Sequence, residues 1–196
     1  GSENSEVTGG IDAFALGVYS VNPSAQIYVK VTNSWYDPEA EKAAASTLLD
    51  MNCDVITQHC DTTYPQLLAQ QKNVYSIGYN SDMSKETPDA CLCSVIWNWS
   101  AYYTAAVQSV IDGTWDGSNY YGGMNENLVG ITQLAYFCKS GTQQKVDEAK
   151  KDIISGKLGI FDGVIETNTG TTVGENGKTL KDSDITGNIN WYFKTV

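Results

Sequence analysis

The chain has 196 residues, 41% of them apolar, and it carries 12 lysines and arginines against 23 aspartates and glutamates. That length and apolar content are enough for one α/β domain with a sizeable core. The formal charge of −11 argues against nucleic-acid binding, because phosphate neutralisation requires clustered cations and only Lys150 and Lys151 are adjacent. No apolar run reaches the roughly 18 to 20 residues of a membrane span.

The first predicted element is a helix over residues 11–21, because Ile11, Phe14 and Val18 recur at the spacing of one helix face. A strand is predicted next, over residues 26–32. A parallel sheet built from βα units normally begins with a strand, and none precedes this helix. We therefore expect the chain to be one lobe of a longer protein.

Helices and strands alternate up to residue 97. Asp37 is predicted to cap a helix that has Pro38 at its first position and ends near Met51. The other predicted elements are a helix over residues 64–71 and strands over residues 53–57, 74–78 and 91–97. Together with residues 26–32, these strands predict a parallel, doubly wound sheet with right-handed crossovers. The predicted fold class is α/β.

The regular alternation ends after residue 97. A helix is predicted over residues 102–111, and residues 113–123, rich in tryptophan, tyrosine and glycine, predict an irregular loop. Residues 143–155 predict a further helix that Gly156 can end. In the C-terminal segment, short strands and a turn at residues 175–177 are typical of a hairpin.

Polar and aromatic residues follow each predicted strand, where an open parallel sheet binds its ligands. Their rings can stack, and their amides and carboxylates can pair with polar edges, as a polar heterocycle or a sugar requires. The candidate ligand-binding residues are Asn33, Trp35, His59, Asp61, Asn80, Asp82 and Trp97.

Several candidates have a structural alternative. Helix capping is the competing explanation for Asn33 and Asp61, which precede predicted helices. Packing of a strand-to-helix turn competes for Trp35. Asn80 and Asp82 lie in a turn that leads into no well-patterned helix, so capping explains these two residues less well.

The single histidine, His59, invites a catalytic or metal-binding interpretation. Catalysis is disfavoured because the adjacent His59 and Cys60 need not face one another and no nucleophile-elbow sequence occurs. Metal ligation by consecutive residues 59–61 is disfavoured because metal sites use spacings that share a face. No phosphate-binding glycine motif is present. We expect neither an enzyme nor a bound metal or cofactor.

The five cysteines are an odd number in a chain too large to need disulfides. Cys91 and Cys93 share one face of a predicted strand, which would suit a metal ion. Their spacing differs from the CxxC of zinc knuckles. We expect the cysteines to be buried or free thiols. They are Cys53, Cys60, Cys91, Cys93 and Cys138.

Nine short runs occur in fixed order from residue 11 to the C-terminal segment. They are IDAFALG at 11–17, SVNP at 20–23, TNSWYDP at 32–38, DVITQH at 54–59, IGYNSDM at 77–83, WNW at 97–99 followed by YY at 102–103, GTW at 113–115, YGGM at 121–124 and IISGKL at 153–158. These runs resemble the basic membrane protein family of ABC-transporter substrate-binding proteins, relatives of purine nucleoside-binding lipoproteins.

The resemblance implies a type I periplasmic-binding-protein fold, in which two α/β lobes joined by three crossings close on a ligand. Residues 1–98 and 126–196 would form the C-terminal lobe, a three-layer α/β/α structure around a parallel sheet. Residues 99–125 would belong to the other lobe, which this chain lacks. Ligand binding by this chain alone should therefore be weak.

The resemblance also implies a function. The protein would be the extracytoplasmic solute-binding component of an ABC importer, with a purine nucleobase or nucleoside as its small-molecule ligand and the transporter permease as its partner. Its only attachment to the membrane would be a lipid anchor on the outer face of the cell membrane. The alternative is a ligand-sensing domain of a signalling receptor with the same fold.

The resemblance carries over to sites residue by residue. In nucleoside-binding relatives, an aspartate in the turn matching residues 78–83 binds ribose, and Asn80 and Asp82 occupy that turn here. Trp97 stands where those relatives have a lysine, and Thr57 where they have an aromatic residue. Because a cationic ribose contact is lost and an indole gained, we expect a nucleobase in preference to a nucleoside.

Overall fold

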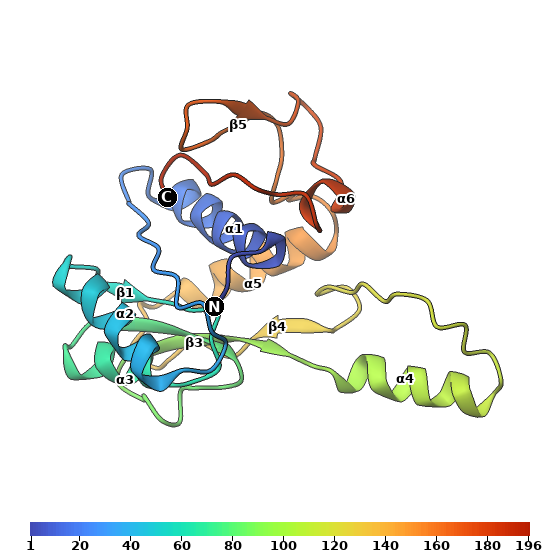
Figure 1. The fold of residues 1–196 in the computed structure, drawn as a ribbon, viewed down its shortest axis with the longest axis horizontal. Coiled ribbons are helices and arrows are strands. Elements are labelled where there is room, and N and C mark those ends of the chain that lie inside the picture. Colours follow the sequence, from blue (N-terminus) through green and yellow to red (C-terminus); the bar gives the residue numbers. More distant parts are fainter.

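A computed structural model describes residues 1–196 (Figure 1). It contains six helices and six strands. In chain order they are α1 (Ser5–Val21), α2 (Pro38–Asp50), β1 (Val55–Ile56), α3 (Tyr64–Gln71), β2 (Tyr75–Asn80), β3 (Cys91–Trp97), α4 (Ser100–Ile111), β4 (Val129–Ile131), α5 (Thr142–Ile154), β5 (Ile165–Glu166), β6 (Thr172–Val173) and α6 (Asp182–Ile185).

The main sheet has the strand order β1-β2-β3-β4. Strands β1, β2 and β3 are parallel, which confirms the predicted α/β class, but β4 runs antiparallel to β3. The expectation of an all-parallel sheet is wrong at this edge. The chain leaves β3 through α4 and returns to the same end of β3, where the Asn98 amide donates to the Leu128 carbonyl at 2.7 Å. A strand entered from that end must run back along its neighbour.

The helices begin and end where the local sequence directs. Asn4 caps α1 by accepting from the Val7 amide at 3.0 Å, so this helix begins before the predicted residue 11. Asp37 caps α2 by accepting from the amides of Glu39 and Ala40, as predicted. The predicted helix over residues 64–71 and the predicted strand over residues 91–97 coincide with α3 and β3.

The strand predicted over residues 26–32 is not part of any sheet. Burial alternates residue by residue from Ala25 to Lys30, as in an extended chain with one face covered. Ile27 donates its amide to the Thr195 carbonyl at 2.8 Å, but the amides from Tyr28 to Thr32 make no hydrogen bond with the protein. The backbone is extended as predicted, but it pairs with no strand.

The predicted turn at residues 175–177 is present, since the Lys178 amide donates to the Glu175 carbonyl. The β5-β6 hairpin nevertheless turns elsewhere, between Thr167 and Thr171. Threonine hydroxyls bond to one another across that turn and stabilise it locally. The prediction of a hairpin was correct and its position was wrong.

Helix α1 lies between the sheet and the C-terminal segment (Figure 1). Its Ala15 packs in a buried apolar cluster with Phe161, Ile165, Ile189 and Phe193. The buried Asp12 accepts from the Phe193 amide at 2.7 Å and fixes the last residues against the helix. The C-terminal segment therefore depends on α1 for its core.

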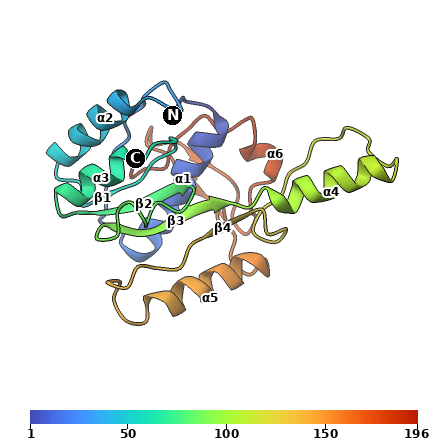
Figure 2. The ribbon, with the colours of Figure 1, turned by 90° about the horizontal axis from the view of Figure 1, so that it is seen from below.

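Helix α4 projects from the body of the molecule (Figures 1 and 2). None of its residues is buried. Large apolar side chains are exposed on it and on the segment that follows, namely Tyr103, Val107, Val110, Ile111, Trp115, Tyr120 and Tyr121. None of the helices is both long and apolar enough to cross a membrane.

Candidate functional site

The carboxyl ends of β1 and β2 form a polar rim with the loop that precedes α2. Asp61 joins three segments there. Its amide donates to the Trp35 carbonyl at 2.9 Å, and its carboxylate accepts from the side-chain amide of Asn80 at 3.1 Å. Both Asp61 and Asn80 are exposed. The paired carboxylate and amide present hydrogen-bonding atoms to solvent at the edge where a parallel sheet binds ligands.

His59 lies beside this pair, between the sheet and α1. Its ring packs edge-on against Tyr79, with centroids 4.8 Å apart. A Cβ atom on Gly10 of α1 would collide with the His59 ring. Burial, with a smaller contribution from the positive N-terminal amine, lowers the pKa of His59. A neutral imidazole at the rim can both donate and accept a hydrogen bond.

An aromatic column rises from the end of β3. The rings of Trp97 and Trp99 are stacked, with centroids 5.1 Å apart and planes inclined by 14°. Tyr103 of α4 continues the stack at 5.8 Å from Trp99. Trp99 and Tyr103 are exposed. The column provides flat apolar surface of the kind on which planar heterocycles stack.

A buried polar network holds the rim in place. Glu41 of α2 is almost fully buried, and its two oxygens accept from the Thr62 hydroxyl at 2.5 Å and the Asp37 amide at 3.2 Å. Gln58 donates to the Thr62 carbonyl at 2.7 Å and to the side chain of the fully buried Gln66 at 2.9 Å. The Gln58 Oε1 atom is buried without a hydrogen-bond partner, but the other groups of this network are bonded, and such networks favour a single arrangement of a loop.

Of the predicted site residues, Asp61 and Asn80 are hydrogen-bonded to each other. The Trp35 carbonyl accepts from the Asp61 amide, and His59 lies two residues before Asp61 in the sequence. Trp97 lies in the aromatic column. Neither Asn33 nor Asp61 caps a helix, because Asp37 caps α2 and α3 begins without a side-chain cap. The capping alternative is therefore wrong for both residues.

Asp82 behaves differently from its expected role. Its carboxylate accepts from the amide of Ser84 at 3.0 Å and from the hydroxyl of Ser84 at 2.6 Å, which closes a local turn. These two bonds lower the pKa of Asp82. A local structural role thus explains Asp82 well, contrary to the sequence-based expectation. Asn33 lies in a left-handed conformation with φ of 54° and has an exposed side chain.

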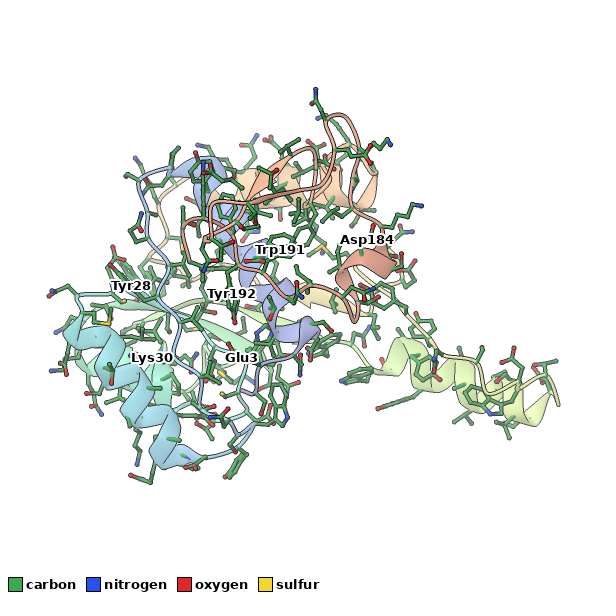
Figure 3. The ribbon with its side chains drawn as sticks, turned by 45° about the horizontal axis from the view of Figure 1, so that its top comes forward. Glu3, Tyr28, Lys30, Asp184, Trp191 and Tyr192 are labelled. Atoms are coloured by element: carbon green, nitrogen blue, oxygen red, sulfur yellow. The ribbon has the colours of Figure 1, made fainter.

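A cavity of about 280 Å³ lies behind the rim, between α1, residues 27–31 and the sheet. Its lining is mostly apolar. Tyr28, Lys30 and Tyr192 also line it, and the Tyr192 hydroxyl donates to Glu3 of the lining at 3.0 Å (Figure 3). No motif in the sequence indicated this cavity, because its wall includes residues 27–31, which were predicted to pair in a sheet.

The described residues form no recognisable metal-binding site. No group of three or more histidine, cysteine, aspartate or glutamate side chains is arranged to hold an ion. All five cysteines are free thiols. Burial, together with the neighbouring Cys91 and Cys138, raises the pKa of Cys93 to about 11, so this residue is a neutral thiol.

Comparisons with known proteins place these features in a family context. Residues 1–161 match the family model described as "ABC transporter substrate-binding protein PnrA-like". The chain is 36% identical to a purine-binding protein of Brucella abortus over 191 residues, which are 97% of this chain and 54% of that protein. It is 31% identical to a putative ABC transporter glucose-binding protein of Haloferax volcanii, over 81% of this chain and 40% of that protein.

Solved structures give the same picture of the fold. A solute-binding protein of Aeropyrum pernix superposes with a TM-score of 0.62 at 16% identity, over 78% of this chain and 52% of that one. A solute-binding protein of Conexibacter woesei superposes with a TM-score of 0.59 at 18% identity, with the same two coverages. The chain spans about half the length of these relatives.

Proposed function

Because this chain belongs to the PnrA-like family of ABC transporter substrate-binding proteins, we propose that its rim forms one wall of a purine-binding cleft. The observation that carries the proposal is the rim itself. The Asp61–Asn80 pair can accept from and donate to the polar edge of a purine, while the column at Trp97 and Trp99 offers a stacking face.

Similarity to the Brucella purine-binding protein over nearly the whole chain supports a purine over other small solutes. Within that class we favour a nucleobase. No lysine lies at the ends of β1, β2 or β3, and Trp97 ends β3 with an indole, so the rim lacks a cation for ribose hydroxyls. Stacking and edge pairing recognise a bare heterocycle without such a contact.

We further propose that residues 1–98 and 126–196 act as one lobe and that residues 99–125 pack on a second lobe. Helix α4 supports this division, because it buries none of its residues and exposes large apolar side chains. In a protein of the relatives' length, the second lobe would cover the rim and close the cleft. Such a protein would deliver its ligand to an ABC permease from outside the cytoplasm, attached to the membrane by a lipid anchor.

The chain itself allows a direct test. We expect adenine, added to millimolar concentration, to shift the NMR signals of the His59, Asp61 and Asn80 backbone amides and of the Trp97 indole. Calorimetry at micromolar concentration should show no binding, because one wall alone leaves the ligand half solvated. Shifts at the rim with glucose and none with adenine would overturn the purine assignment, as would equal shifts with both.

A matched pair of variants localises the effect. Asp61→Ala removes the carboxylate from the rim and should abolish the adenine-dependent shifts. Asp54→Ala removes an exposed carboxylate from the opposite, amino-terminal end of β1 and should leave them unchanged. Adenosine should bind at least about tenfold more weakly than adenine, a difference of about 1.4 kcal/mol.

A further inference from the structure

Three of the five cysteines lie around the start of β3. Cys91 and Cys93 belong to that strand, and Cys138 lies in the turn that follows β4. Cys91 is fully buried, whereas Cys93 and Cys138 are half-buried. None of these thiols belongs to the polar rim or to the aromatic column, so a role for them is independent of the proposed ligand.

A register shift in the sheet places Cys91 and Cys93 on opposite faces. Cys91 pairs with Ser76 of β2. Cys93 pairs with the next residue of β2, Ile77, so β3 holds one extra residue at this point. Successive residues of a strand point to opposite faces, and paired residues of neighbouring strands share a face. The Cys91 thiol accordingly lies 3.7 Å from the hydroxyl of the buried Ser94. The expectation that Cys91 and Cys93 share one face is therefore wrong.

The face that carries the Cys93 thiol also carries the turn with Cys138. Tyr75 lies two residues before Ile77 in β2, so its ring is on the same face as Cys93. Phe137 stacks on that ring, with centroids 5.8 Å apart and planes inclined by 16°. Because Cys138 directly follows Phe137, it lies on the same side of the sheet as Cys93.

Backbone hydrogen bonds bring the same turn to the edge of β3 beside Cys93. The carbonyls of the residues on either side of Cys93 accept from the amides of Ala135 and Thr132, at 2.8 and 2.9 Å. The Cys138 amide donates to the Ala135 carbonyl at 3.0 Å and closes the turn. Cys138 is thus held near Cys93 by the backbone as well as by the stacked rings, whereas Cys91 is turned away.

We propose that Cys93 and Cys138 form a disulfide when the chain is oxidised, and that the structure with free thiols is the reduced form. The oxidant is a low-molecular-weight disulfide such as glutathione disulfide. Disulfides persist outside the cytoplasm, where the substrate-binding proteins of ABC importers act.

The reaction consists of two thiol–disulfide exchanges. Burial, together with the neighbouring Cys91 and Cys138, raises the pKa of Cys93 to about 11, so the first attack falls to Cys138. The Cys138 thiolate bonds to one sulfur of glutathione disulfide and releases one glutathione thiolate, which takes up a proton. Cys93 then loses its proton, bonds to the Cys138 sulfur and releases the second glutathione. The two cysteines together lose two electrons and two protons, which the glutathione disulfide gains.

The disulfide closes a loop that contains α4 and β4. Figure 2 shows that β3 leads into α4 and that the chain returns through β4. A cross-link around such a loop stabilises a protein chiefly by restricting the unfolded chain. We expect oxidation to raise the midpoint of thermal unfolding by about 5 °C or more. The bond also keeps the edge between β3 and β4 closed, whichever surface α4 packs against.

The test maps the bond in the folded chain. The purified chain is incubated with glutathione disulfide without denaturant, the remaining thiols are blocked with N-ethylmaleimide, and the chain is cut before its aspartates by endoproteinase Asp-N. The cut before Asp112 separates Cys93 from Cys138. We expect a cross-linked pair of peptides whose fragment spectra place the bond between Cys93 and Cys138. A bond at Cys91, a lasting glutathione adduct on Cys138, or unreacted thiols overturn the proposal.

Two variants are the matched controls. Cys138→Ser should abolish both the cross-link and the rise in the unfolding midpoint. Cys53→Ser should leave both in place, because Cys53 lies outside β3 and its neighbouring turn. Light scattering of the oxidised chain distinguishes a bond within one chain from a bond between two copies. A cross-link found only in dimers overturns the proposal, as does an unfolding midpoint that rises equally in Cys138→Ser.

Discussion

Two walls at the carboxyl end of the sheet differ in how they are supported. One is the polar rim around Asp61, and the other is helix α4 with its exposed apolar side chains. The rim around Asp61 rests on a buried network in which Glu41, Thr62 and Gln66 each have partners. The apolar face of α4 has no buried network beneath it, since no residue of that helix is buried and its Tyr102 and Tyr103 stack on the nearby Tyr120 and Trp99. The difference indicates that the rim is preorganised by this chain, whereas α4 depends on an outside surface for its packing.

The largest effect should come from the network. Glu41→Ala deletes the acceptor of the Thr62 hydroxyl and the Asp37 amide in a buried position, and should lower the free energy of unfolding by about 2 to 4 kcal/mol. Urea denaturation measures the loss. Glu39→Ala on the same helix is the matched control, because Glu39 is exposed and should cost less than about 0.5 kcal/mol. Equal losses would contradict the role of the network.

Asp12 can be compared with Glu41. Both are buried carboxylates, but both oxygens of Glu41 accept hydrogen bonds, whereas Asp12 has an incomplete set of partners. One oxygen accepts from the Phe193 amide and the other is unbonded. Burial, against that hydrogen bond, raises the pKa of Asp12 to about 6. The protonated form therefore stabilises the fold below about pH 4, and this stabilisation is lost as pH rises through 6.

The loss between pH 4 and pH 7 should be at most about 3 kcal/mol, given about 1.4 kcal/mol per unit of pKa. Asp12→Asn carries no charge at any pH, so it should be more stable than the parent chain at pH 7 and lack this part of the pH dependence. Thermal unfolding at several pH values follows both chains. A parent chain whose stability rises from pH 4 to pH 7 relative to the variant would contradict the assignment.

The contact between α1 and the rim should give an intermediate effect. Gly10→Ala forces a methyl group into the His59 ring and should destabilise the fold by about 1 to 3 kcal/mol, as overpacking does. It should also shift the His59 signals in NMR spectra. Gly17→Ala on the same helix meets no atom and should instead stabilise by about 0.5 to 1 kcal/mol. Opposite signs for the two alanines are the expected result.

The smallest effect should come from α4. Tyr103→Ala removes an exposed ring that packs against Trp99 and Tyr102 of its own segment and should change the free energy of unfolding by less than about 0.5 kcal/mol. Urea denaturation checks this value beside Glu41→Ala. A cost comparable with that of Glu41→Ala would show that α4 is held by this chain, and the contrast between the two walls would disappear.

Local signals explain how much of the fold was predictable. Asp37 and Pro38 specify the start of α2, and the apolar run of residues 91–97 specifies β3, because caps and patterns act within a few residues. Residues 26–32 carry an equally clear local pattern, yet a ladder also requires a partner distant in sequence. Strand β4 carried no signal, because three residues show no period.

The residues of the candidate site also fall into those that the sequence could predict and those that it could not. Topology alone predicted that residues at the ends of β1 and β2 would meet, and Asp61 does bond to Asn80. Glu41 and Gln66 could not be predicted, because polar side chains on helices are ordinarily exposed and these two are buried. The sequence did not predict that Asp82 bonds to the nearby Ser84, because these bonds depend on a turn geometry that composition does not reveal.

The stacked indoles have an optical consequence. Trp97 belongs to the sheet and Trp99 opens α4, and their nearly parallel rings are only 5.1 Å apart. Transition dipoles at this distance couple, so the pair should act as a single chromophore with a paired positive and negative band in circular dichroism. The amplitude of that couplet depends on the angle between sheet and helix. Circular dichroism of this tryptophan pair should therefore report any reorientation of α4 relative to the sheet without an added label.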